Sequence, residues 1–204
     1  MPPTNAQQTT PILIIGGGGR EHALTWQLER SAQTGPLYVA PGNGGTERPD
    51  RGVFNVALDV SDHDQVVAFC RAKDIGLVVV GPEAPLADGI ADALSAAGLR
   101  CFGPSRAAAQ LEASKAYAKA FMARHNIPTA AAQIFDQAEP AKDYIRELDG
   151  PCVVKASGLA AGKGVLMCED LGRCGRDVVT RHEGLGVGFG GLELSGGPRR
   201  TKAT

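Results

Sequence analysis

Short apolar runs alternate, along the first half of the chain, with segments whose apolar residues recur every three or four positions. The short runs are typical of buried parallel strands, and the longer segments are typical of helices that cover a sheet. Expected strands lie at residues 11–15, 37–40, 53–60, 77–80 and 100–102, and expected helices lie at 21–32, 61–70 and 86–97. This alternation predicts an α/β fold with a doubly wound parallel sheet, in which ligands bind beyond the carboxyl ends of the strands.

One of these helices carries a start signal. Ser61 is followed three positions later by Asp64, which resembles a capping box. We therefore expect Ser61 to be the N-cap of this helix.

A smaller α+β unit follows. The pattern predicts one long helix from Pro104 to about His125, whose alanine-rich stripe would pack in a core. We place the domain boundary near Gln110, so that residues 11–110 form an N-terminal α/β domain and residues 111–170 form the second unit. Strands are expected there at 134–135, 151–156 and 165–168, and a further helix at 139–148.

The character of the chain changes after about Asp170. Residues 171–204 contain nine glycines and show no sustained helical or strand period, so little apolar surface offsets the entropy of ordering them. We expect this glycine-rich tail to be disordered or poorly packed. The sequence leaves open whether the tail belongs to a splice variant or results from a frame error.

Charge and composition exclude several classes of protein. The net charge is −1, so a nucleic-acid or membrane partner that needs a basic surplus is not expected. No apolar run approaches the roughly 20 residues of a membrane span, and the N-terminus has no secretory signal, which makes the cytoplasm the default location. The five cysteines are odd in number and form no Cys-x-x-Cys pair, so neither a disulfide framework nor a zinc site is expected.

Four glycines, Gly16 to Gly19, separate the first expected strand from its helix. They let main-chain N–H groups approach a phosphate, and Arg20 can add a bidentate charge. The alternative is a tight strand–helix turn without a ligand. A dinucleotide site matches poorly, because Glu21 stands where the fingerprint Gly-x-Gly-x-x-Gly needs its third glycine, and the second strand ends at Pro41 with no carboxylate.

Two further motifs follow expected strands. Gly81-Pro82-Glu83 supplies an acid for a cationic or hydroxyl-bearing substrate, although the helix dipole alone also favours an acid at this place. Lys155 leads into the loop 158–164, whose small residues and second lysine suit closure over a triphosphate; a plain hairpin turn is the alternative. The loop is not a Walker A sequence, and no nucleophile–histidine arrangement is readable anywhere in the chain.

Six sequence blocks together resemble the glycinamide ribonucleotide synthetase family of ATP-grasp ligases. The blocks keep the family's order over about Ile12 to Glu169. They are Gly16 to Ala23, Ala40 to Thr46, Val79 to Leu86, Cys101 to Pro104 with Ala108 to Lys115, Phe121 to Thr129, and Val153 to Val165.

The resemblance implies a ligase of purine synthesis that joins glycine to 5-phosphoribosylamine at the expense of ATP, through glycyl phosphate. It implies that residues 111–170 are part of an ATP-grasp domain. The expected cofactors are ATP with Mg²⁺ or Mn²⁺, and the expected partners are these small molecules, with no nucleic acid or membrane. Such chemistry relies on positioning and charge neutralisation, which agrees with the lack of a readable nucleophile.

The resemblance also assigns site residues. Contacts to ATP are expected from Lys115, Lys155, Ser157, Gly158, Leu159, Ala160, Ala161, Gly162, Lys163 and Gly164. Contacts to phosphoribosylamine are expected from Gly18, Gly19, Arg20, Glu21, Asn43, Gly81, Pro82 and Glu83.

The chain also departs from the family. Gly17 stands where members often carry Ser or Asn, and the resemblance ends near Asp170. The family's adenine hinge, acidic metal ligands and C-terminal domain have no counterpart, so no metal ligands and little activity are expected of this chain by itself. Two other hypotheses are a non-catalytic sugar-phosphate-binding fragment and a Rossmann oxidoreductase, the latter opposed by Glu21 and the missing acid.

Overall fold

The computed structural model describes residues 9–148, 152–156, 165–168 and 192–196. The chain divides into two compact units, Met1–Ala109 and Gln110–Thr204. Each unit has its own sheet and its own core, so the two are described separately.

The first unit is built on a five-stranded sheet in which every neighbouring pair of strands is parallel. The order β3-β2-β1-β4-β5 confirms the predicted doubly wound α/β fold. Strand β1 lies at the centre, where its Ile14 is flanked by Val39 and Val79 on the neighbouring strands. The strands are β1 (Thr10–Gly16), β2 (Thr34–Pro41), β3 (Val53–Asn55), β4 (Leu77–Val80) and β5 (Cys101–Phe102).

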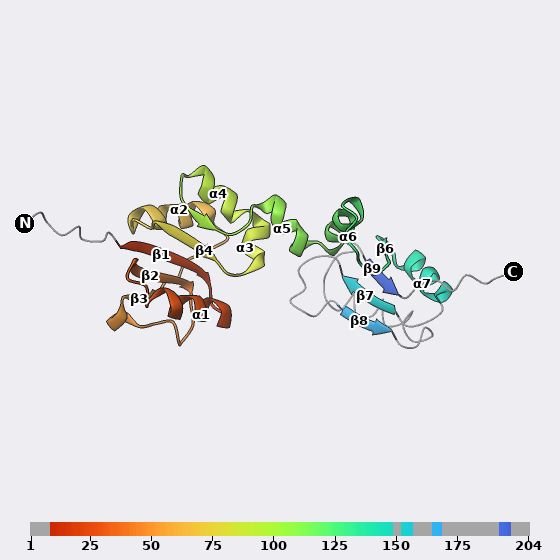
Figure 1. The fold of residues 1–204 in the computed structure, drawn as a ribbon, viewed down its shortest axis with the longest axis horizontal. Coiled ribbons are helices and arrows are strands. Elements are labelled where there is room, and N and C mark those ends of the chain that lie inside the picture. Colours follow the sequence, from red (N-terminus) through yellow and green to blue (C-terminus); the bar gives the residue numbers. More distant parts are fainter. Residues whose placement is uncertain (1–8, 149–151, 157–164, 169–191, 197–204) are drawn as a thin grey trace, which may run out of the picture. The chain divides into compact units, whose positions relative to one another are not determined.

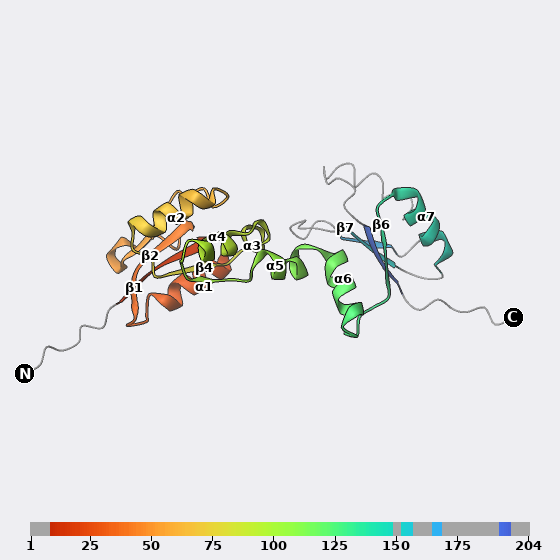
Figure 2. The same cartoon turned by 90° about the horizontal axis from the view of Figure 1, so that it is seen from above.

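Helices cover both faces of this sheet (Figures 1 and 2). Along β1, Ile12 and Ile14 belong to the core on the α1 side, while Leu13 and Ile15 belong to the core on the side of α2, α3 and α4. All four side chains are buried, and burying one of this size stabilises a fold by about 1.5–3 kcal/mol. The helices are α1 (Gly19–Leu28), α2 (His63–Ala72), α3 (Glu83–Asp88) and α4 (Ile90–Ala96), and a short 3-10 turn, η1 (Pro49–Arg51), precedes β3.

Several element boundaries differ from the sequence prediction. Helix α1 ends at Leu28 and not at Ala32, and the strand expected at 53–60 is only the three residues of β3. The N-cap of α2 is Asp62, whose carboxylate accepts the N–H of Gln65 at 3.0 Å, and the hydroxyl of Ser61 instead donates to Asp59. The helix expected at 86–97 is two helices, because Gly89 between α3 and α4 has a φ of 103°, a value that ends an α-helix.

The second unit contains α6 (Lys115–Arg124), α7 (Ala138–Glu147) and a four-stranded sheet in the order β6-β9-β7-β8. The paired strands are antiparallel. Helix α5 (Arg106–Ala113) precedes them and crosses the division between the units. The strands are β6 (Ala132–Phe135), β7 (Cys152–Ala156), β8 (Val165–Cys168) and β9 (Leu192–Gly196).

The prediction of one long helix over residues 104–125 is wrong. Ser114 separates α5 from α6 with extended backbone, and its hydroxyl caps α6 by accepting the N–H of Tyr117 at 3.2 Å. The alanine stripe is also less buried than expected, since α5 buries Ala109 alone and α6 buries no residue. A local cap therefore outweighs the helix propensity of the alanines.

The expectation for the glycine-rich tail needs correction at five residues. Leu192–Gly196 forms β9, which pairs with β6 on one side and β7 on the other. This segment alternates apolar and polar residues over too short a stretch to indicate a strand by sequence alone, and two neighbouring strands complete its hydrogen bonding. Residues 171–191 and 197–204 of the tail lie outside the described residues.

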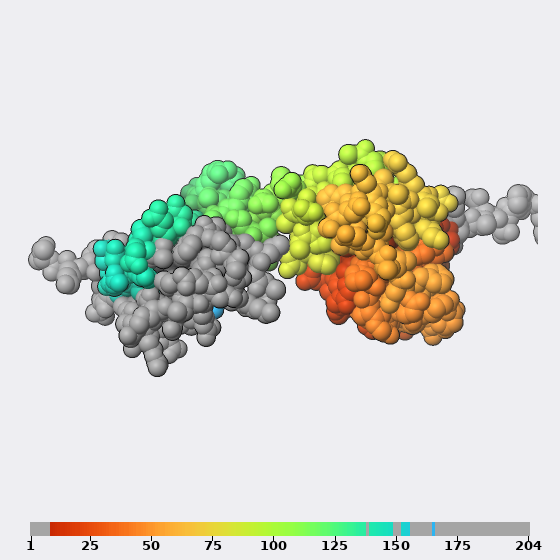
Figure 3. All heavy atoms as spheres, turned by 180° about the vertical axis from the view of Figure 1, so that it is seen from behind, coloured from red at the N-terminus to blue at the C-terminus, as the bar shows by residue number. Residues whose placement is uncertain are grey.

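Helix α7 packs on this sheet through one apolar face. Ala141 and Ile145 share a buried cluster with Cys152 and Val154 of β7. The outer face carries ion pairs between Glu139 and Lys142 and between Asp143 and Arg146, and it lies at the surface (Figure 3). Among the described residues, no helix is long and apolar enough to cross a membrane.

Candidate functional site

The glycine turn after β1 and the turn after β4 meet at one edge of the parallel sheet. Strands β1 and β4 are neighbours, and the helices that follow them, α1 and α3, pack on opposite faces. This is the topological switch point of a doubly wound sheet, where ligands of such folds bind. Two motifs 60 or more residues apart in the chain are thereby joined, since Arg20 donates to the carbonyl of Gly81 across 61 positions.

Arg20 and Glu83 place opposite charges at this edge. Arg20 Nη1 lies 2.5 Å from the carbonyl oxygen of Gly81 and 3.9 Å from Glu83 Oε2. Both side chains are about half exposed or more, at 65% and 48%, so their ion pair contributes only about 0–1 kcal/mol. The guanidinium and the carboxylate are therefore both accessible from solvent.

Glu21 lies in the interior, unlike the exposed Arg20 that precedes it in the motif. The residue is only 4% exposed, and its Oε2 accepts the N–H of Gly18 at 2.7 Å. A Cβ built on Gly81 would lie 2.6 Å from the carboxyl carbon of Glu21, and one on Gly16 would lie 2.5 Å from its Cγ. Glu21 thus occupies the space between the ends of β1 and β4, and no side chain larger than glycine fits beside it at either position.

Asn43 ties the turn after β2 to the glycine turn. Its Nδ2 donates to the carbonyl of Gly17 at 3.0 Å, and its Oδ1 accepts the N–H of Gly45 at 2.8 Å. The close approach also requires Gly17, because a Cβ there would lie 2.6 Å from the carbonyl oxygen of Gly42. Asn43 therefore has a structural role in holding the two turns together.

Two residues of this hydrogen-bonded group were not predicted from the sequence. Asn55, at the end of β3, donates from Nδ2 to the carbonyl of Asn43 at 2.9 Å, and its Oδ1 lies 2.7 Å from the hydroxyl of Thr46. Thr46 is fully buried and also accepts the N–H of Asn43. The sequence signal for Asn55 was its place as a polar residue at the end of a strand. The signal for Thr46 was its place in the sequence block from Ala40 to Thr46.

His22 packs against the same turn. A Cβ on Gly45 would overlap its imidazole ring, with Nδ1 at 2.9 Å. The ring thus lies on the backbone of the β2 turn. The carboxyl edge of the sheet is consequently lined by three turns, after β1, β2 and β4, which are joined by side chains that donate to main-chain carbonyls.

The residues expected to contact ATP lie in the second unit. Lys115 is the first residue of α6, and Lys155 lies on β7, where its register partners are Val165 and Glu193. The helix dipole disfavours a lysine in the first turn of a helix, so the helix itself gives no reason for Lys115 at this place. Both residues are partly exposed, and each carries an ammonium group of the type that binds phosphate oxygens. Ser157 to Gly164 lie outside the described residues.

No metal centre is indicated in the part of the chain that the structure describes. There, no three His, Cys, Asp or Glu side chains gather in a way that could hold an ion. We therefore assign no metal ligand to these residues.

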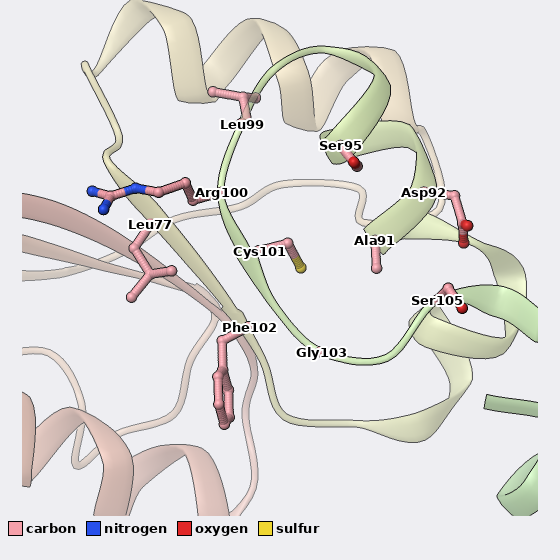
Figure 4. A pocket seen from close by; sticks show the side chains of 10 residues that line it. All are labelled: Leu77, Ala91, Asp92, Ser95, Leu99, Arg100, Cys101, Phe102, Gly103 and Ser105. Carbon is pink, nitrogen blue, oxygen red and sulfur yellow. The ribbon is translucent and has the colours of Figure 1, made fainter. Parts of the chain in front are cut away.

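A separate hollow of about 630 Å³ lies beside the edge strand β5 and helix α4. In Figure 4, Cys101 points toward Ala91 and Phe102 points away from it. Burial raises the pKa of the Cys101 thiol, while Phe102 is 69% exposed. The predicted site residues do not line this hollow, so it is distinct from the edge where the three turns meet.

Comparisons with known proteins agree with this division of the chain. Residues 10–112 match the family described as phosphoribosylglycinamide synthetase, N domain, and residues 113–180 match its ATP-grasp (A) domain. The second match thus extends about ten residues past Asp170, where the sequence resemblance was expected to end.

Individual relatives and a solved structure point the same way. Phosphoribosylamine–glycine ligase of Allochromatium vinosum is 54% identical over 177 residues, covering 87% of this chain and 40% of the relative. The enzyme of the same name from Pasteurella multocida is 56% identical over 160 residues, covering 78% of this chain and 37% of the relative. The crystal structure of phosphoribosylamine–glycine ligase from Thermotoga maritima superposes with a TM-score of 0.68 at 27% identity, covering 91% of this chain and 43% of that one. The chain therefore spans about two fifths of the length of these relatives.

Proposed function

This chain belongs to the phosphoribosylglycinamide synthetase family, and we propose that it carries the sugar-phosphate site of a phosphoribosylamine–glycine ligase together with part of its ATP site. The proposed reaction consumes ATP, glycine and 5-phosphoribosylamine and yields glycinamide ribonucleotide, ADP and phosphate. A carboxylate oxygen of glycine attacks the γ-phosphorus and ADP leaves. The amine of phosphoribosylamine then attacks the carbonyl carbon of glycyl phosphate, forms the amide bond and expels phosphate.

In this proposal the three turns bind phosphoribosylamine. The start of α1, with the main-chain N–H groups of Gly19 and Arg20 and the guanidinium of Arg20, faces the phosphate, because a helix N-terminus and a guanidinium both favour an anion. The N–H of Gly18 is bound by Glu21 Oε2, so Gly18 contributes close approach of the backbone and no donor. Asn43 and the segment Gly81-Pro82-Glu83 line the ribose and the amine, and the carboxylate of Glu83 attracts a cationic or hydrogen-donating group. Glu21 supports the turn from behind.

The second unit contributes charge to the ATP side. Lys115, Lys155 and Lys163 neutralise phosphate charge, and the segment Ser157, Gly158, Leu159, Ala160, Ala161, Gly162, Lys163, Gly164 closes over the phosphates. Mg²⁺ or Mn²⁺, which ATP-grasp ligases use together with ATP, would neutralise phosphate charge when bound. Because no ligand set gathers among the described residues, no step is assigned to a metal here.

The observation that carries the proposal is the meeting of Arg20 with Gly81 and Glu83 at the switch point. It is tested by titrating the 204-residue protein with ribose 5-phosphate, followed by calorimetry. We expect saturable binding that weakens as salt is added, since the contact is largely ionic. Binding that does not saturate, or that persists when both Arg20 and Glu83 are replaced by alanine, contradicts the proposal.

A non-catalytic fragment that only binds a sugar phosphate is the second candidate. The contacts among Arg20, Gly81 and Glu83 favour it, because all three residues lie within the first unit. Radiolabelled glycine with ATP, magnesium and freshly made phosphoribosylamine separates the two. We expect little labelled glycinamide ribonucleotide from these 204 residues, because loss of a single hydrogen-bond donor that stabilises transition-state charge already lowers the rate by about 10²–10³-fold. Turnover that needs both substrates, at a rate near that of a full-length relative, overturns this expectation. A cytoplasmic location without nucleic-acid or membrane partners stays part of the proposal.

A further inference from the structure

Glu21 stands where dinucleotide-binding proteins of the doubly wound fold carry the third glycine of their fingerprint. The fingerprint of dinucleotide-binding proteins, Gly-x-Gly-x-x-Gly, begins after the first strand, and here it would read Gly16, Gly18 and then Glu21. The pyrophosphate of a dinucleotide crosses the switch point at this turn. The strand order β3-β2-β1-β4-β5 matches that architecture, so the turn, and not the sheet, must decide which phosphates enter.

The structure shows where the Glu21 side chain goes. It is directed inward, between the ends of β1 and β4, against two glycines that have no room for a Cβ. Its Oε2 takes the N–H of Gly18 at 2.7 Å, one of the main-chain donors that a bridging phosphate would need. Gly81 is therefore a glycine because Glu21 lies beside it, which differs from the usual reason of close approach by a ligand. Gly16 lies equally close to Glu21 and also has a φ of 126°, a conformation that itself favours glycine.

Two physical consequences follow from this placement. The crevice that a pyrophosphate would enter is filled by the side chain of Glu21, a residue that is only 4% exposed. That side chain also ends in a carboxylate, which repels a second phosphate close to the first. A single terminal phosphate at the outer N–H groups of α1, beside the exposed Arg20, meets neither obstacle.

We propose that Glu21 is a specificity-determining residue, which restricts the glycine turn to a terminal phosphate by filling the β1–β4 crevice with a negatively charged side chain. The proposal rests on the proposed function, because it refines which phosphate ligands the same turn accepts. Discrimination would then come from repulsion of ligands that carry a bridging pyrophosphate.

The test compares ribose 5-phosphate with ADP-ribose, which presents the same sugar through a bridging pyrophosphate. Calorimetric affinities are measured for the 204-residue protein, for Glu21→Gly, which completes the dinucleotide fingerprint, and for Glu21→Gln. Asp64→Asn on the exposed side of α2 removes the same charge away from the turn and serves as the matched control. Emission of the single tryptophan, Trp26 on α1, reports whether each variant is folded.

We expect the wild-type protein to favour ribose 5-phosphate, and Glu21→Gly to gain at least about fivefold in affinity for ADP-ribose relative to ribose 5-phosphate. Glu21→Gln keeps the volume and the acceptor for Gly18 but loses the charge, so the affinity for ADP-ribose should rise about threefold while the affinity for ribose 5-phosphate stays unchanged. An unchanged ligand ratio in Glu21→Gly overturns the inference. If that variant does not fold, unchanged affinities in Glu21→Gln overturn it instead. Failure of the wild-type protein to bind ribose 5-phosphate contradicts the proposed function separately, because the affinity of Glu21→Gly for ADP-ribose is then compared directly with that of the wild-type protein.

Discussion

The guanidinium of Arg20 donates to the main-chain carbonyl of Gly81 at 2.5 Å, and this bond joins the helix after β1 to the turn after β4. The two residues belong to different sequence motifs, and the parallel pairing of β1 with β4 brings them together. A cation is thereby held at the edge where the helix N-terminus also favours an anion.

Replacement of Arg20 should therefore weaken phosphate binding. We expect Arg20→Ala to lower affinity for ribose 5-phosphate by about tenfold, and Arg20→Lys to lower it less, because lysine keeps the charge but not the two-pronged geometry. Arg30→Ala is the control, since Arg30 stacks on Trp26 beyond the other end of α1. Titration calorimetry gives the affinities. An equal loss in Arg30→Ala would show that general charge, and not position, governs binding.

Asn43 should be important for the stability of the first unit. Asn43→Asp removes the donor to the Gly17 carbonyl and places a carboxylate against it, with an expected cost of about 1–3 kcal/mol. Gln27→Glu on the exposed side of α1 makes the same amide-to-acid change and should cost less than about 0.5 kcal/mol. Urea unfolding followed by Trp26 emission measures both. Equal costs in the two variants would contradict the structural role of Asn43.

Cys70 should react slowly with alkylating reagents. Burial, together with the nearby Cys101 thiol, raises the pKa of the Cys70 thiol to about 11 from an ordinary 9.0. A raised pKa leaves less thiolate below pH 11, and the thiolate is the reactive form. At about pH 8 we expect alkylation of Cys70 at least ~100-fold slower in the folded protein than in concentrated urea, as the two pKa values imply.

The pH dependence of this reaction provides its internal check. The unfolded thiol ionises near pH 9 and the folded one near 11, so the rate ratio between the two states should shrink as pH rises through this window. The stability that comes from keeping the thiol protonated is lost over the same interval. Peptide mass spectrometry follows the labelled residue. Fast labelling of the folded protein at neutral pH is the contrary result.

The cap at Ser114 should control the start of α6. Ser114→Ala removes the acceptor for the Tyr117 N–H and should destabilise the helix by about 1 kcal/mol. Hydrogen exchange at residues 115–118 should accelerate about fivefold as a result. Ser95→Ala, within the exposed face of α4, is the control and should leave exchange unchanged, because alanine is at least as good a helix former as serine. Unaltered exchange at Tyr117 in Ser114→Ala would contradict the cap.

The local elements of the first unit were largely predictable from the sequence. The apolar run at 11–15 is long enough and β-branched enough to form a strand buried on both faces, and Ile12 to Ile15 are all buried in the structure. Chain reversals were marked by glycine and proline, whose backbone preferences are local. Helix ends were predicted less well: Asp62 and Ser114 became caps because particular side chains reached particular N–H groups.

The tertiary structure alone decided which residues meet. Asn55 contacts Asn43 only because β3 pairs with β2, and β9 forms only between β6 and β7, which supply hydrogen bonds that five residues cannot make by themselves. Glu21 shows the same limit most clearly. Its place in a glycine motif predicted a ligand contact, but its inward direction depends on the space between β1 and β4, which exists only after residues 65 positions apart have paired. The sequence by itself thus determined the approximate positions of the strands in the first unit, its turns and the family, whereas long-range pairing decided the partners of each polar side chain, because those contacts have no local cause.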